Sequence, residues 1–365
     1  MKKSSFFLGG ALLLVSLFTT SCKEVLGSLD NPVGAYVEID ETAVAEILPT
    51  QEFTRTATTI SPEAIVYTSS NESVATVDAL TGKVTALKAG TTTITASVPA
   101  SKDGLYLAGS KSYTVTVVGK VVDLSKETSH YFAEYGDVLT GALNGDYALV
   151  IPDGVKVLLK GMSTNPKYWP GIWCYGDATI IIADGSENTV VSQTSERAGI
   201  QIGPKGKKLT IEAEKEGTGK LTAIGRMYAA GIGNGSAEVS GDIEIKGGVI
   251  EAIARDRSLS STWGASAGIG TDDDGGSVGD ITISGGTVTA LGYDGGAGIG
   301  TCWSGPSCGN ITITKDVKIV TAVKGTNAYS CIGKSNINSP VGTITIGGKT
   351  DVDTTGESYV YEPSK

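Results

Sequence analysis

The four tryptophans of this 365-residue chain are the side chains best suited to binding another molecule. The tryptophans are Trp169, Trp173, Trp263 and Trp303. Three tyrosines lie near them in the sequence: Tyr168, Tyr175 and Tyr293. A flat apolar ring with a polar edge suits the face of a sugar. We therefore expect a glycan, or another partner on a cell surface, to bind Tyr168, Trp169, Trp263, Tyr293 and Trp303. A structural interpretation competes for Trp169 and Trp173, which would then cover the open end of a hydrophobic core, and for Trp173 we favour it.

Carboxylates gather in the stretch TDDDGGSVGD, at Asp272, Asp273, Asp274 and Asp280. Oxygen ligands of this kind can hold Ca²⁺, but the order and spacing of an EF-hand are absent, so a solvated acidic loop is the other interpretation. Cleavage of a sugar chain requires paired carboxylates, or a basic side chain acting with calcium. The candidates for such chemistry are Arg255, Asp256, Arg257, Asp272 and Asp294. Nothing in the sequence shows these side chains converging, so we assign no catalytic residue, no metal ligand and no cofactor apart from the Ca²⁺ alternative, and lean against an enzyme.

A Gly-rich turn, Ala-Gly-Ile-Gly or a close variant, recurs through the second half of the chain. It ends at Gly203, Gly233, Gly270, Gly300 and Gly333, at intervals of 30 to 37 residues. A phosphate-binding loop would need a helix after the glycines, and no helical pattern follows any of these turns. Each turn is followed instead by an alternating apolar pair, Leu209 and Ile211 in the first repeat and Ile-x-Ile in the other four, and, in most repeats, by a third alternating segment. A repeat of this length without a helix is typical of a solenoid.

The Ile-x-Ile segments show how such a repeat would fold. Alternation places both isoleucines on one face, and a single unit cannot bury that face. Stacked units would form ladders of isoleucine inside, with threonine, lysine and acidic side chains outside, and would pair each strand with the same strand of the next coil. Glycine would allow the bends at the corners. We therefore predict an all-β chain whose residues 138–360 form a right-handed parallel β-helix with about three strands per coil, followed by a tail at 361–365.

This repeat resembles bacterial cell-surface β-helices found beside immunoglobulin-like domains. The resemblance rests on the run from ADGSENTV through KLTIEAEKEGTGKLTAIG to AAGIG. At the level of the fold, it also resembles carbohydrate-binding β-helices related to pectate lyases. The resemblance indicates architecture more strongly than activity.

Residues 33–119 alternate apolar and polar side chains as strands do. Val84, Ala86, Ile94, Ala96 and Val98 should share one buried face. The segment resembles a group 2 bacterial immunoglobulin-like domain at Tyr67, Ser69-Ser70-Asn71, Val74-Ala75, Val77-Asp78, Gly82, Val84-Thr85-Ala86, Gly90 and Ile94-Thr95-Ala96. The resemblance implies a small β-sandwich that serves as a spacer or an adhesion module. Residues 120–137 are expected to be a junction, with the single histidine, His130, at its surface.

The first residues have the pattern of an export signal. Two lysines precede an apolar run that is too short for a membrane-spanning helix, and Thr19-Thr20-Ser21 leads into Cys22. This pattern resembles the lipobox of bacterial lipoproteins, in which the cysteine is acylated; ordinary secretion is the alternative. The resemblance implies a signal peptide at 1–21, lipidation of Cys22, a tether at 22–32 and an anchor in the outer membrane. The side of the membrane does not follow from these residues, and of the two sides we expect the cell surface.

Charge and cysteine content narrow the possible partners. The formal net charge of −10 disfavours nucleic acid and leaves the lipid as the only contact with a membrane. Export permits disulfides, so Cys302 and Cys308 either pair or remain buried thiols with Cys174 and Cys331. One histidine and no Cys-x-x-Cys pair argue against zinc.

The features together favour a monomeric, non-catalytic surface lipoprotein for adhesion or polysaccharide binding. A polysaccharide lyase, a glycoside hydrolase and a purely structural surface protein remain the alternatives.

Overall fold

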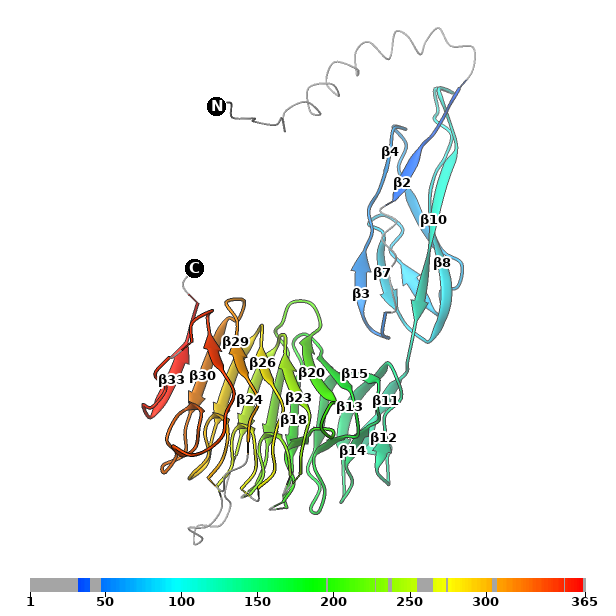
Figure 1. Ribbon diagram of the computed structural model, residues 1–365. Helices are drawn as coiled ribbons and strands as arrows, with labels where there is room; N and C mark the ends of the chain where they lie inside the picture. Colours follow the sequence, from blue (N-terminus) through cyan, green and yellow to red (C-terminus); the bar gives the residue numbers. More distant parts are fainter. Residues whose placement is uncertain are drawn as a thin grey trace, which may run out of the picture. The chain divides into compact units, whose positions relative to one another are not determined.

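The computed structural model describes residues 32–39, 47–194, 196–226, 228–235, 238–254, 265–273, 275–303, 307–350 and 352–363 (Figure 1). The regular elements in these residues are β-strands and one short 3-10 helix, η1 (Leu124–Lys126). No helix in this part of the chain combines the length and apolar character that a membrane crossing requires. The chain divides into two compact units, Met1–Val118 and Gly119–Lys365.

The first unit consists mainly of short antiparallel sheets. Its strands are β1 (Val33–Gly34), β2 (Val37–Ile39), β3 (Glu52–Thr54), β4 (Ala57–Thr59), β5 (Val66–Ser69), β6 (Ala75–Val77), β7 (Lys83–Ala86), β8 (Gly90–Val98), β9 (Tyr106–Leu107) and β10 (Gly109–Val117). Antiparallel pairing joins β10, β8 and β5 in one sheet and β3, β7 and β6 in another. Val84, Ala86, Ile94, Ala96 and Val98 are buried, as their alternation predicts.

The second unit is a solenoid of parallel strands. Its strands are β11 (Val121–Asp123), β12 (Tyr131–Phe132), β13 (Asp137–Leu143), β14 (Leu149–Ile151), β15 (Val155–Thr164), β16 (Ile172–Cys174), β17 (Ala178–Ile182), β18 (Glu187–Val191), β19 (Ile200–Gln201), β20 (Lys208–Ala213), β21 (Lys220–Ile224), β22 (Ile232–Gly233), β23 (Asp242–Ile245), β24 (Val249–Ile253), β25 (Ile269–Gly270), β26 (Ile281–Ile283), β27 (Thr287–Leu291), β28 (Ile299–Gly300), β29 (Ile311–Ile313), β30 (Ile319–Val323), β31 (Ile332–Gly333), β32 (Ile344–Ile346) and β33 (Ser358–Tyr361).

These strands form three ladders that run along the solenoid (Figure 1). Ladder A is β13-β15-β17-β20-β23-β26-β29-β32, and ladder B is β15-β18-β21-β24-β27-β30-β33. Ladder C is β12-β14-β16-β19-β22-β25-β28-β31. From β16 onward each coil contributes one strand to each ladder, so the expected three strands per coil are present.

The repeated isoleucines fill the interior in register. Ile243, Ile281 and Ile311 stack in ladder A, each at most 1% exposed, and Ile269 and Ile299 stack in ladder C with no exposure. Each buried isoleucine removes enough apolar surface from water to contribute about 1.5–3 kcal/mol. The Ala-Gly-Ile-Gly turn is therefore a corner that ends in a two-residue strand with an inward isoleucine.

The parallel pairing begins before the boundary expected at residue 138. Strand β11 pairs with β13, and β12 pairs with β14, so both lie within the segment 120–137 that the sequence suggested as a junction. Leu124 in η1 is fully buried among the first strands. The segment has too few alternating apolar residues to indicate a coil, because Val122, Leu124 and the partly buried Tyr131 are its only contacts with the core before Ala133.

A Gly-Asp or Gly-Asn pair opens successive coils at the corner between ladders C and A. Asp242 Oδ1 accepts the backbone N–H of Asp280 at 2.9 Å, and Asp280 Oδ1 accepts that of Asn310 at 2.7 Å. Asn310 Oδ1 accepts the N–H of Thr343 at 2.9 Å. A Cβ at Gly309 would collide with the Asp280 carboxylate, which explains the glycine. This side-chain ladder gives partners to N–H groups that lie at a corner.

The last coil is covered by the residues that follow β32. Strand β33 pairs with β30 in the antiparallel direction, and Tyr359 and Tyr361 pack against the core. Thr354 donates its hydroxyl to the carbonyl of Ile332 at 2.8 Å, while its own carbonyl accepts the N–H of Cys331 at 2.8 Å. These contacts satisfy the outer side of β31, which has no further coil to pair with.

Candidate functional site

Aromatic side chains are concentrated on the outer side of ladder C, over the first coils. In β16, Ile172 and Cys174 point into the core, so Trp173 between them points outward. The same outward position holds Phe132, Val150, Trp173 and Gln201 in β12, β14, β16 and β19, which pair in register. The short strands therefore place a row of side chains from different coils along one face.

The Trp173 ring is held between two other aromatic rings. The ring centroid of Trp169 lies 5.8 Å from that of Trp173, and the Tyr175 centroid lies 4.8 Å away in an edge-on arrangement. Such arrangements contribute about 0.5–1.5 kcal/mol beyond the burial of area. Trp173 lies on an outer strand face, so the expectation that it covers the open end of the core is wrong.

Trp169 is positioned by the loop between β15 and β16. Asp146 fixes this loop by accepting the backbone N–H groups of Lys167 and Tyr168 at 2.8 and 2.9 Å. The Trp169 ring meets the His130 ring edge-on, with centroids 4.8 Å apart. His130 Nδ1 accepts the N–H of Ala148 at 2.9 Å, so the histidine buttresses the aromatic group and is not an isolated surface side chain.

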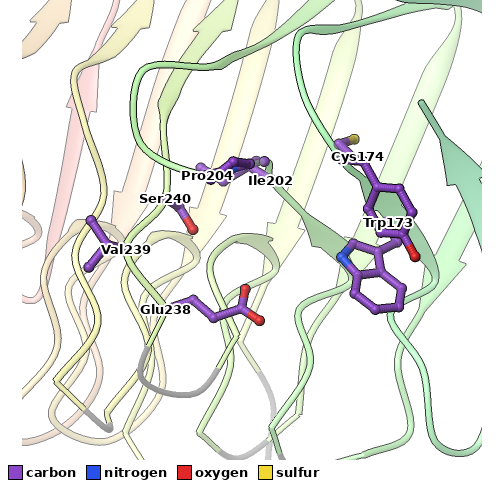
Figure 2. A pocket seen from close by; sticks show the side chains of 9 residues that line it. Trp173, Cys174, Ile202, Pro204, Glu238, Val239 and Ser240 are labelled. Atoms are coloured by element: carbon purple, nitrogen blue, oxygen red, sulfur yellow. The ribbon is translucent and has the colours of Figure 1, made fainter. Parts of the chain in front are cut away.

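A pocket of about 280 Å³ opens beside Trp173. Figure 2 shows the Trp173 indole on one side and the Glu238 carboxylate on the other, with Pro204 above Glu238 in this view. The residues that line it are Trp173, Cys174, Tyr175, Ile202, Gly203, Pro204, Glu238, Val239 and Ser240. The Cys174 thiol is fully buried, and this burial raises its pKa to about 12, so the thiol is protonated at neutral pH.

Glu238 is held in place by two polar side chains. Its Oε1 lies 3.1 Å from a guanidinium nitrogen of Arg197, and its Oε2 accepts a hydrogen bond from Gln201 Nε2 at 2.7 Å. The Arg197 guanidinium also lies over the Trp173 ring, 5.7 Å from its centroid. Gln201 is fully buried, whereas Arg197 and Glu238 remain about one third exposed. The carboxylate, the guanidinium and the indole are therefore fixed relative to one another.

This arrangement provides groups that can hold a sugar ring. A ring surface with hydrogen-bond donors and acceptors at its edge matches a sugar, which has an apolar face and a rim of hydroxyls. Among the described lining residues, Glu238 supplies a single carboxylate, whereas glycoside hydrolysis by the common mechanism uses two.

Tyr293 and Trp303 form a second group, at the corners on either side of β28. The Trp303 ring packs over Gly295 and is 52% exposed. Tyr293 lines a polar cavity of about 420 Å³ with Asp294, Lys324 and Asn327. Strand β28 lies four strand steps from β16 in ladder C, which is about 19 Å at the usual strand spacing. The structure therefore brings Tyr168 near Trp169, and Tyr293 near Trp303, but does not bring the two groups together.

The acidic residues of the stretch 271–280 that the structure describes form hydrogen bonds within the solenoid. The N–H of Asp272 donates to Asn234 Oδ1 at 2.7 Å, Asp273 Oδ2 accepts the N–H of Ala265, and Asp280 belongs to the corner ladder. Within the described part of the chain, no three histidine, cysteine or acidic side chains are close enough to hold a metal ion.

Several residues singled out in the sequence lie outside the described residues. They are Cys22, Arg255, Asp256, Arg257, Trp263 and Asp274. Cys174, Cys302, Cys308 and Cys331 are all free and buried, which selects the thiol alternative for Cys302 and Cys308. Arg197, Gln201 and Glu238 were not expected at a site, because nothing near them in the sequence marks them and the fold alone brings them to Trp173.

Comparison with known proteins identifies the first unit. Residues 37–108 match the family model of the bacterial Ig-like domain (group 2). No curated protein matches the chain.

Proposed function

We propose that this chain is a non-catalytic glycan-binding protein, and that the pocket between Trp173 and Glu238 holds a sugar ring. One observation carries the proposal: the outward Trp173 indole lies next to an ion pair in which an Arg197 guanidinium nitrogen is 3.1 Å from Glu238 Oε1. The ring gives a stacking surface, and the charged pair presents both donors and acceptors to sugar hydroxyls.

The exposed fraction of these groups fits a binding role. A charged pair that is one third exposed contributes little to stability, typically about 0–1 kcal/mol, so folding alone gives little reason to hold it over an indole. Prior fixation lowers the entropy lost on binding, because Gln201 and Arg197 already orient the carboxylate.

The rest of the chain is proposed to present this pocket at the cell surface. An acyl group on Cys22 would anchor the protein to the outer membrane, and the Ig-like domain would act as a spacer. The second unit would be a right-handed β-helix, because crossover connections between parallel strands are right-handed in about 98% of cases. Adhesion to a host or cell-surface glycan, or capture of a polysaccharide, would be the outcome.

A glycan array probed with the purified whole chain, with and without Ca²⁺, tests the proposal. We expect at least one polysaccharide to bind in both conditions, and binding to be lost in Trp173→Ala and weakened in Glu238→Gln. Trp173→Phe keeps a ring and should retain part of the binding. Tyr36→Ala, which removes an exposed ring from the Ig-like domain, is the matched control. An array without a bound glycan, or binding that survives Trp173→Ala, would overturn the proposal.

A further inference from the structure

A second exposed ring lies in the same outward row as Trp173. Phe132 in β12 is 56% exposed. The residue before it, Tyr131, points the other way, toward the core, where its hydroxyl donates to Oδ2 of the buried Asp137 at 2.7 Å. Phe132 pairs in register with Val150, and Val150 pairs with Trp173. Phe132 and Trp173 therefore lie two strand steps apart, about 10 Å at the usual spacing.

The surroundings of Phe132 share some features with those of Trp173. Tyr135 lies three residues after Phe132, at the corner toward ladder A, and Tyr175 lies at the corresponding corner after β16; both rings are more than 40% exposed. Lys156 Nζ lies 5.7 Å from the centroid of the Tyr135 ring. Each of the two positions thus combines an outward ring, a corner tyrosine and a cation over one of these rings.

Strand β14 lies between Phe132 and Trp173, and its outward residue is Val150. Val150 is only 2% exposed, so neighbouring side chains cover it and the surface between the two rings is filled. Aromatic residues are also concentrated here, because Tyr131, Phe132, Tyr135, Tyr147, Tyr168, Trp169, Trp173 and Tyr175 all fall within one short part of the chain.

We infer that the ligand is an extended oligosaccharide that crosses β12, β14 and β16 along the solenoid, with one sugar on Phe132 and another in the Trp173 pocket. The inference rests on the proposed function. One sugar ring cannot contact both platforms across two strand steps, whereas a chain of linked sugars can. A chain that uses both platforms loses its freedom once and makes two contacts, so its affinity exceeds that of a short fragment.

Titration calorimetry on the whole chain tests the inference, with cello-, xylo- and manno-oligosaccharides from monosaccharide to hexasaccharide as probes. In the unmodified protein we expect affinity to rise by up to about tenfold from the disaccharide to the hexasaccharide, as one additional aromatic contact allows. Phe132→Ala should abolish that rise and leave disaccharide binding unchanged. Tyr135→Ala should reduce the rise, and Phe132→Tyr should keep it.

The possible failures separate the two proposals. Equal affinity for the disaccharide and the hexasaccharide, or a rise that survives Phe132→Ala, would overturn the extended ligand while leaving sugar binding at Trp173 in place. A Phe132→Ala variant that weakens the two sugars equally would also overturn it. Absence of binding to every probe and to the glycan array would remove the proposed function and this inference together.

Discussion

The Asp280 carboxylate accepts the backbone N–H of Asn310, one coil further along, at 2.7 Å. The same bond links Asp242 to Asp280 and Asn310 to Thr343, so the corner between ladders C and A carries a line of side chains that connects coil to coil. The strand pairing of the ladders and this corner line act together to fix the rise of the solenoid.

Asp280→Ala is expected to lower the free energy of unfolding by about 1 kcal/mol. The change leaves the N–H of Asn310 without its acceptor, and the corner is exposed enough for water to replace part of the bond. Asp280→Asn keeps an acceptor oxygen and should cost less. Urea unfolding of the three proteins checks this, and identical midpoints for Asp280→Ala and the unmodified chain would contradict the role of the corner line.

Neighbouring residues in β29 should respond very differently to substitution. Ile313 is fully buried, and Ile313→Ala is expected to cost about 2–5 kcal/mol because it opens a cavity in the stacked core. Thr312 points outward from the same strand, and Thr312→Ala should change stability by no more than about 0.5 kcal/mol. Similar losses for both variants in urea unfolding would mean that the inward and outward faces are assigned wrongly.

Stability should fall in alkali because of the buried thiols. Burial raises the pKa of Cys174 and of Cys308 from 9.0 to about 12, so the folded chain keeps protons that the unfolded chain loses. The stabilisation is fully present below pH 9 and is lost as the pH rises toward 12. Melting temperatures across this range should decline, and Cys174→Ala should decline less steeply, while starting from a lower value at neutral pH. Parallel curves for the two proteins would show that Cys174 ionises equally in both states.

Removal of residues 350–365 is expected to make the protein self-associate. The truncation takes away β33, which pairs with β30, and Thr354, which bonds to Cys331 and Ile332. The strands thereby exposed form an edge that can pair with a second chain. Light scattering after gel filtration should show oligomers, whereas removal of 362–365 alone should not. A truncated chain that stays monomeric with an unchanged melting temperature would show that this segment does not cap the solenoid.

The architecture could be predicted because inward isoleucines repeat at a fixed interval. Stacked coils need one apolar face on each strand. The sequence spacing of Ile243, Ile281 and Ile311 therefore predicts the positions at which these residues pair in ladder A. The first coil does not carry that pattern, so the sequence predicts a junction where the structure has β11 and β12. The Gly-Asp pairs were visible as well, but their meaning depends on the next coil, because the Asp280 carboxylate occupies the space that a side chain at position 309 would need.

The candidate site could be predicted only in part. Trp169 and Tyr168 were expected from their ring chemistry, but the outward direction of Trp173 follows from the register of β16 against β14 and β19. Arg197 and Glu238 meet across two coils, 41 residues apart, and such pairing leaves no trace in the local sequence. Phe132 was hidden in the same way, because its exposure depends on the pairing of β12.

The affinity of the whole chain for the strongest glycan on the array, measured by calorimetry before and after Trp173→Ala, tests the central claim most directly. We expect a loss of at least about tenfold, equal to about 1.4 kcal/mol, with unchanged affinity in Tyr36→Ala. Trp173→Ala also removes the contacts with Trp169 and Tyr175, so its melting temperature should fall while the protein stays folded at the assay temperature. An affinity that Trp173→Ala leaves unchanged, in a protein that remains folded, would contradict the claim that this pocket binds sugar.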